Sequence, residues 1–440
     1  MLALQGALAR EIARALRVSL TTQERTLLDW VPTRNQAAYA AFVRGRALAA
    51  RSYNREDLVG AVAAFEEAVA LDPHFALAWA HLSMAHGSLY WFTFLDPSPG
   101  RLAQCKTAVD EALRIAPDLP EAHLTLALYH YRGFRDWQQA RREIELAHAS
   151  MPGDAEVACA RGLILRRMGK WAESTTAFET AIAVDPRHGP GLLGLADNLG
   201  FARRFEAAIR VARQVLAFAP DHRLAGRHAC WYRFALNGDR AALLAGLDRI
   251  ARGGQGSTRD LCEVALLRGD HAEALRVLAG SAETTWRDHK REISRAELQA
   301  LACSLAGDGA GARAFAEQAV AFYAQCALRR EPEQVFATMS LARSLALLGR
   351  GLDALATGRR AMDMLPVSRD ALWGPEIIGE YAAVALLVGD VDEALVHLCR
   401  MLRHPWDVSA HELRFDPLWR RLAGEPRFES IVALAEPVPS

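Results

Sequence analysis

One short stretch of the sequence has the residue types and spacing of a phosphate site. GPGLLG at 189–194 matches Gly-x-Gly-x-x-Gly, in which backbone N–H groups approach a dinucleotide closely. That site requires a strand before its first glycine. Here the preceding residues have a helical pattern, and the glycines open the next helix. We therefore interpret the glycines as packing positions and expect no nucleotide cofactor.

Several histidines have spacings that could serve metal chemistry. His123 and His130 lie two helical turns apart, which is a plausible ligand pair. These positions are also packing positions of a helix pair, and His86 takes the equivalent place upstream. His411 and Glu412 lack the second histidine of a zinc-protease motif. We favour packing over metal binding and expect no metal, no cofactor and no catalytic residue, so that the protein is not an enzyme.

Composition restricts the remaining classes of function. The formal net charge is +0, so nothing attracts the whole chain to nucleic acid or acidic membranes. No apolar run is long enough to span a membrane, and charged residues interrupt the first twenty positions. We expect a cytoplasmic protein, because its cysteines are scattered, odd in number and never spaced as CxxC. They are Cys105, Cys159, Cys230, Cys262, Cys303, Cys326 and Cys399.

A repeat organises the helices that position these residues. Within DAEVACARGLILRRMGKWAESTTAFETAIAVDP (154–186), small and bulky residues take fixed places: Ala158, Gly162, Leu165, Ser174, Phe178 and Pro186. Antiparallel helices approach closely only at small side chains, so Gly162 and Ser174 mark a crossing and Phe178 fills the space beside it. These offsets resemble the tetratricopeptide (TPR) repeat, and the resemblance covers most of the chain.

The prolines and glycines give the period and extent of the array. Pro152, Pro186 and Pro220 are 34 residues apart, and two earlier prolines continue the series at longer spacings. Beyond residue 220, glycines mark further turns between helices: Gly238, Gly269, Gly307, Gly349 and Gly389. We expect an all-α fold of about ten helix pairs, a TPR-type α-α superhelix forming a right-handed solenoid of helix hairpins.

The predicted organisation has four parts. They are an N-terminal helical segment (1–34), a regular TPR array (35–220), degenerate TPR-like helix pairs (221–403) and a C-terminal capping segment (404–440). The first part contains an amphipathic helix at 2–20 and a capping box, TTQE, at 21–24. The coil-like RGGQGSTRD at 252–260 is the best candidate for an internal hinge.

Both ends resemble one bacterial family. LAREIARALRVSLTTQERTLLDWVPTRNQAAYAAFVRGR resembles the segment that joins a TolB-like domain to TPR repeats, and ELRFDPLWRRLAGEPRFESIVA resembles the end of the same proteins. Members carry an N-terminal class III nucleotide cyclase or winged-helix DNA-binding domain. The resemblance implies a sensory half, cut from a longer protein or encoded alone, and carries over neither catalysis nor DNA binding.

The concave groove is the predicted binding site. In a TPR stack the first helix of each pair lines this groove, and the register assigns to it His81, Met84, Glu121, Leu124, Leu128, Tyr131, Cys159, Leu163, Arg166, Arg167, Leu193 and Asp197. The mixture suits a peptide with apolar anchors and an acidic group held by Arg166 and Arg167. Cys159 and Leu163 replace the usual Lys/Asn set of a chaperone-tail clamp, which speaks against chaperone tails as ligands.

A second surface could also meet an acidic partner. Residues 203–252 contain ten arginines and four acidic residues, which leaves open a basic docking patch or a solvated face. Few aromatic residues accompany them, so nucleic acid is not favoured. The leading interpretation is a non-enzymatic scaffold for a protein or peptide in signalling or transcriptional control. The alternative is a regulatory subunit, or the C-terminal sensory part, of a nucleotide cyclase or other enzyme. Homo-oligomerisation is left open.

Overall fold

The structure is a computed structural model that describes residues 31–50, 55–91, 96–253, 256–287, 291–328 and 333–436. The predicted amphipathic helix at 2–20 and capping box at 21–24 lie outside these residues. The described residues are helical almost throughout, which confirms the all-α prediction. The chain divides into two compact units, Met1–Gly133 (unit 1) and Phe134–Ser440 (unit 2). This division falls within the predicted array at 35–220.

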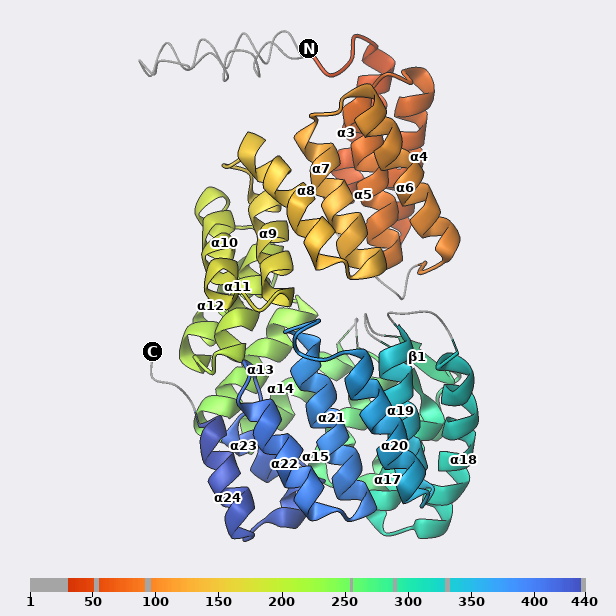
Figure 1. The fold of residues 1–440 in the computed structure, drawn as a ribbon, viewed down its shortest axis with the longest axis vertical. Helices are drawn as coiled ribbons and strands as arrows, with labels where there is room; N and C mark the ends of the chain where they lie inside the picture. Colours follow the sequence, from red (N-terminus) through yellow and green to blue (C-terminus); the bar gives the residue numbers. More distant parts are fainter. Residues whose placement is uncertain are drawn as a thin grey trace. The chain divides into compact units, whose positions relative to one another are not determined.

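Unit 1 consists of antiparallel helices that pack in pairs along the chain (Figure 1). Phe42, Phe65 and Phe75 meet in its core, with ring centroids 5.8 Å apart for the first two. The described elements are α3 (Gln36–Ala49), α4 (Arg55–Leu71), α5 (Ala76–Trp91), α6 (Pro99–Ile115) and α7 (Pro120–Tyr129), which passes into a π-helical turn, His130–Phe134, at the unit boundary.

Unit 2 continues with helix pairs and ends in short helices (Figure 1). Between α16 and α17 the described residues include a short antiparallel ribbon of β1 (Thr285–Arg287) and β2 (Glu292–Ser294). The helices are α8 (Trp137–Ser150), α9 (Ala155–Arg167), α10 (Trp171–Val184), α11 (Gly189–Phe201), α12 (Phe205–Phe218), α13 (Arg223–Asn237), α14 (Arg240–Arg252), α15 (Thr258–Arg268), α16 (His271–Ala279), α17 (Arg295–Ala306), α18 (Gly309–Cys326), α19 (Glu333–Leu347), α20 (Gly351–Met364), α21 (Trp373–Val388), α22 (Val391–Leu402), α23 (Ala410–Phe415) and α24 (Pro426–Val432), with 3-10 turns at Trp419–Leu422 and Ala433–Ala435.

Glycine and phenylalanine set the spacing within the most regular helix pair of unit 2, α9 and α10. A Cβ on Gly162 of α9 would lie 2.8 Å from the Phe178 ring of α10, and Gly194 of α11 contacts the same ring. The buried Ser174 hydroxyl donates to the Gly162 carbonyl over 2.8 Å. The ring therefore fits only because both neighbouring helices lack a side chain where they meet it. The predicted packing roles of Gly162, Ser174 and Phe178 are confirmed.

The glycine turns predicted beyond residue 220 are also confirmed. Their φ angles lie between 69° and 93°, in the left-handed region that glycine adopts without a steric penalty; they are Gly238, Gly269, Gly307, Gly349 and Gly389. In most of these turns an aspartate follows and its side chain accepts a backbone N–H of the next helix; these are Asp239, Asp270, Asp308 and Asp390. A Gly-Asp pair thus ends one helix and caps the next.

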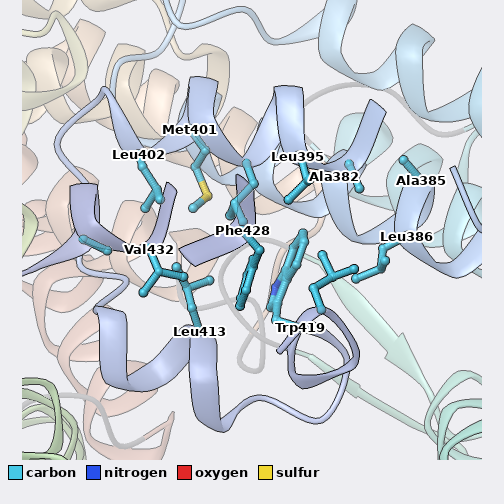
Figure 2. Packing of buried hydrophobic residues seen from close by; sticks show 14 of the residues in the cluster. Ala382, Ala385, Leu386, Leu395, Met401, Leu402, Leu413, Trp419, Phe428 and Val432 are labelled. Carbon is cyan, nitrogen blue, oxygen red and sulfur yellow. The ribbon is translucent and has the colours of Figure 1, made fainter. Parts of the chain in front are cut away.

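The C-terminal segment packs onto the last helix pair. Figure 2 shows Trp419 and Phe428 amid aliphatic side chains that α21 and α22 contribute, among them Leu386 and Leu395. Phe428 is fully buried. This cluster anchors residues 410–435 and so fixes where the preceding loop, 403–409, crosses the unit.

Unit 2 returns on itself, because the start of α21 packs against its first helices. Arg167, at the end of α9, donates to both carboxylate oxygens of Asp370 over 3.4 and 3.1 Å. Its guanidinium lies 3.6 Å from the centroid of the Trp373 ring. The Trp137 indole N–H donates to the Arg369 carbonyl over 2.8 Å. We call Trp137, Arg167, Asp370 and Trp373 the closing cluster.

The turns between the two helices of successive pairs contact the same C-terminal region. These contacts run from Arg135 to Trp373, from Gly169 to Ala371, from Arg203 to the carbonyls of Leu402 and Val408, and from Gly238 to His411. Arg135 and Arg203 have φ angles of 52° and 55°, a conformation that is unfavourable for a residue with a side chain. The guanidinium groups of both residues contact the C-terminal region.

Candidate functional site

The predicted groove residues of unit 1 are mostly packed within it. Leu124, Leu128 and Tyr131 are buried, whereas Met84 and Glu121 are partly exposed. His81 packs against the rings of Phe42 and Phe65, and burial together with Arg46 lowers its pKa to about 4. The neutral imidazole of His81 therefore packs as part of the core.

The apolar candidates of unit 2 also contribute to packing. Cys159 is 3% exposed and belongs to the cluster around Phe178 and Phe205, where Leu163 packs against the same residues. Burial raises the pKa of the Cys159 thiol, so this side chain behaves as a small apolar group. Leu193 packs beside Leu192 in the next cluster.

The two arginines predicted to hold a partner's carboxylate both have carboxylates inside the chain. Arg167 is buried with Asp370 in the closing cluster. Arg166, also buried, donates to Asp197 over 3.2 Å. The other Asp197 oxygen lies 3.5 Å from Nδ1 of His228. Arg166 of α9 and Asp197 of α11 are thus partners of each other within the chain.

The structure adds a pocket that the sequence did not indicate. His228, Trp231 and Tyr232 of α13 face Asp407 and Glu412 across a hollow of about 190 Å³. The pocket adjoins the predicted candidate Asp197 of α11, because its wall residue His228 of α13 lies 3.5 Å from that carboxylate. Its two acidic residues come from a segment without repeat spacing, some 180 residues from α13 along the chain, so no local pattern could have identified them.

Glu412 has an unusual electrostatic environment. Burial, followed by repulsion from Asp407 and Asp416, raises its pKa to about 8. Burial also lowers the pKa of His228, against the attraction of Asp197. Near neutral pH the pocket therefore holds a carboxyl group that carries a proton mainly because it is buried, and the carboxylates around it add to this effect.

A second buried charge network lies further along the first helices. Arg343 of α19 donates to Glu297 of α17 over 3.2 Å and pairs with Glu380 of α21. The Tyr323 hydroxyl donates to Glu297, which is 2% exposed. Burial lowers the pKa of Arg343. Because its members satisfy one another, this network joins helices rather than offering open polar groups.

The glycine-rich stretch and the histidines that suggested nucleotide or metal binding take part in the helix packing. GPGLLG lies in α11, and the helix α10 precedes it in place of a strand. Nε2 of His123 donates to the Pro117 carbonyl over 3.0 Å. His86 is buried, with Nδ1 2.9 Å from the Arg101 guanidinium.

Within the described ranges there is no group of three or more His, Cys, Asp or Glu residues that could hold a metal ion. In the same residues, no helix has the length and apolar character needed to cross a bilayer.

Among known proteins, those that resemble this chain are proteins of solved structure. No family model and no curated protein matches the sequence. A thermophilic TPR protein of Thermus thermophilus is 18% identical, with a TM-score of 0.37, over 44% of this chain and 97% of its own. A TPR protein from Parabacteroides merdae is 12% identical, with a TM-score of 0.38, over 56% and 95%. YrrB, a TPR protein with an unusual peptide-binding site, is 17% identical, with a TM-score of 0.27, over 47% and 96%.

The assignment of this chain to the TPR type therefore rests on its own geometry. Its helix pairs have the 34-residue proline spacing, the glycine crossing filled by Phe178 and the left-handed glycine turns. The fold of the chain is an all-α array of TPR-type helix hairpins.

Proposed function

We propose that this protein is a non-enzymatic scaffold that binds a segment of another protein on the first-helix side of unit 2. The pocket at Trp231 and Glu412 carries this proposal, because it combines aromatic walls with polar groups. Between α9 and α11, by contrast, the Phe178 ring of α10 fills the space beside Gly162 and Gly194. TPR arrays in general present such a surface for peptides.

The biological setting is part of the same proposal. The resemblance of both chain ends to TolB-like/TPR regulators supports a role in bacterial signalling or transcriptional control. The free thiols of all seven cysteines support a reducing, cytoplasmic compartment. The partner would then be an effector domain or another regulatory protein.

Site-specific photo-cross-linking tests the binding surface. A photoreactive phenylalanine analogue replaces Trp231 in one variant and Leu352 of α20, which is 87% exposed, in the control. Both variants are expressed in the source organism, and cross-linked proteins are identified by mass spectrometry. We expect one specific protein to be captured at position 231 and not at 352, and to form a stoichiometric complex when purified.

Two results would overturn the proposal. Equal capture at both positions would show that unit 2 has no specific surface there. Turnover of nucleoside triphosphates by the purified chain would show that it is an enzyme. Capture of a catalytic domain at position 231 would instead support the scaffold role and would identify the partner as an effector.

A further inference from the structure

We propose that the pocket between α13 and residues 407–412 takes one guanidinium or ammonium group, the side-chain end of an arginine or lysine in the bound segment. This inference rests on the proposed scaffold function and specifies the chemistry of its partner. It also departs from the sequence prediction of an acidic partner, since Arg166 and Arg167 already have carboxylates within the chain.

The size of the pocket fits a single side chain. Its volume of about 190 Å³ is below the roughly 300–1,000 Å³ of pockets that hold whole small-molecule ligands. An extended chain that lies along the first helices could insert one long side chain there and leave its backbone outside. The pocket therefore fits a protein segment better than a free metabolite.

The walls suit a cation with an apolar stem. Trp231 is partly exposed, so its ring can contact a bound group, and Tyr232 forms the wall beside it. The Tyr232 ring is fixed by Phe205, with centroids 6.0 Å apart, and by His228 at 5.4 Å. Aromatic faces attract guanidinium and ammonium groups and also cover the methylene chain behind them.

The charges around Glu412 favour the same ligand. After burial, the carboxylates of Asp407 and Asp416 raise the pKa of this group most, the backbone N–H of Ser409 lowers it, and Glu263 raises it less. Two arginines lie near these carboxylates. Arg203 interacts electrostatically with Asp407 and donates to the carbonyls of Leu402 and Val408, and Arg227 donates to Glu263 over 2.8 Å. A cation in the pocket would reduce the mutual repulsion of the carboxylates.

This arrangement couples binding to proton release. In the free protein burial and its acidic neighbours raise the pKa of Glu412 to about 8, whereas a bound cation favours the ionised form. The charged or titratable groups that face it are Asp407, Asp416, Glu263 and, across the pocket, His228, whose pKa burial lowers. Binding should therefore release a proton near pH 7, and affinity should rise as the pH increases toward 9.

Short peptides with isosteric side chains test this inference on the full chain. The probes are acetylated Gly-Ser-Arg-Ser-Gly amide and the same peptide with citrulline, which has the shape of arginine without its charge. Agmatine serves as a free cation. Calorimetry in two buffers of different ionisation enthalpy, at pH 6, 7 and 9, measures both affinity and proton release. We expect the arginine peptide to bind at least tenfold more tightly than the citrulline peptide and agmatine.

Three variants define where the peptide binds. Glu412→Gln keeps the size of a carboxyl that is already largely protonated, and Trp231→Ala removes a wall. Glu317→Gln is the matched control, because it neutralises an exposed carboxylate on α18. We expect the first two to lose at least tenfold in affinity, and Glu412→Gln also to abolish proton release. The control should match the wild type, and melting temperatures verify that each variant is folded.

The outcomes separate this inference from the proposed function. Equal binding of the arginine and citrulline peptides, or unchanged binding by Glu412→Gln, overturns the cation pocket. Tighter binding of agmatine than of the peptide overturns the side-chain assignment in favour of a free amine. If the partner captured at position 231 binds Glu412→Gln as well as wild type, the pocket assignment fails and the scaffold function stands.

Discussion

At the residue scale, the buried ion pair of Arg167 and Asp370 joins two parts of unit 2 that lie far apart in the chain. Asp370 is fully buried, and one of its oxygens also accepts the backbone N–H groups of Leu372 and Trp373 over 3.0 Å each. Arg167 supplies the compensating positive charge. A buried ion pair adds little net stability compared with two well-packed apolar side chains in its place. The loss of one partner, however, leaves the other charge buried and uncompensated.

We therefore predict that Asp370→Asn strongly destabilises unit 2. Removal of one member of a buried ion pair costs about 3–5 kcal/mol. The matched control is Asp353→Asn, which breaks a pair with Arg350 at the surface, where such pairs contribute about 0–1 kcal/mol. Urea denaturation of the two variants gives the comparison. Equal losses would show that the Asp370 site is hydrated and open.

A second prediction concerns pH and Glu412. Because its pKa is raised in the folded protein to about 8, folding favours the protonated form. Its contribution to stability is complete below its ordinary pKa, near 4.5, and is lost as the pH rises through about 8. In this interval the loss approaches about 1.4 kcal/mol per pH unit.

Denaturation of the wild type and Glu412→Gln from pH 5 to pH 8 measures this contribution. We expect the variant to gain stability relative to the wild type as the pH rises, because glutamine cannot ionise. The difference between them removes the effects of all other titrating groups. Parallel pH profiles would contradict the raised pKa of Glu412.

At the element scale, the helix hairpins could be predicted well because their determinants are local. A glycine at the crossing and a Gly-Asp turn act within a few residues of where they stand, and both repeat along the chain. Prediction was weaker for the direction of individual side chains. Of the positions assigned to the groove, Cys159 belongs to a hydrophobic cluster and Leu193 packs, partly buried, against the next one, since contacts with the next helix determine what each position covers.

We predict that Gly162→Leu destabilises the protein much more than Cys159→Ala. The larger side chain would collide with Phe178, and overpacking of this kind costs roughly 1–3 kcal/mol or more. The cysteine substitution removes one sulfur atom from a packed cluster, which costs about 1 kcal/mol. Thermal denaturation compares the two, and equal melting temperatures would show that the helix register is wrong.

At the scale of the whole molecule, the closure of unit 2 could not be predicted from the sequence. The hydrogen bonds of Trp137 with Arg369 and of Arg167 with Asp370 join residues more than 200 positions apart. A repeat pattern fixes how each hairpin packs on the next, but small changes of angle accumulate along an array and decide where its end returns. The pocket residues Asp407 and Glu412 depend on that return, which is why they were missed.

An engineered disulfide tests the closure. A Cβ at position 169 would lie 3.2 Å from that of Ala371, slightly below the roughly 3.5–4.5 Å that separates the Cβ atoms of a disulfide, so a small backbone shift would allow the bond. We predict that Gly169→Cys combined with Ala371→Cys forms a cross-link under mild oxidation, despite about 1–2 kcal/mol of backbone strain at position 169. Non-reducing electrophoresis detects the loop through a shift in mobility. The single variants are the controls, and a double variant that behaves like them would contradict the closure of unit 2.

The central claim is that unit 2 binds a protein segment and recognises a basic side chain in it. A selection of random twelve-residue peptides on the immobilised full chain tests this claim most directly, with Glu412→Gln and Glu317→Gln screened in parallel. The account predicts that arginine or lysine is enriched at one position of the peptides selected by the wild type and by Glu317→Gln, and that Glu412→Gln loses this enrichment. Enrichment of aspartate or glutamate, retained equally by all three proteins, would contradict it.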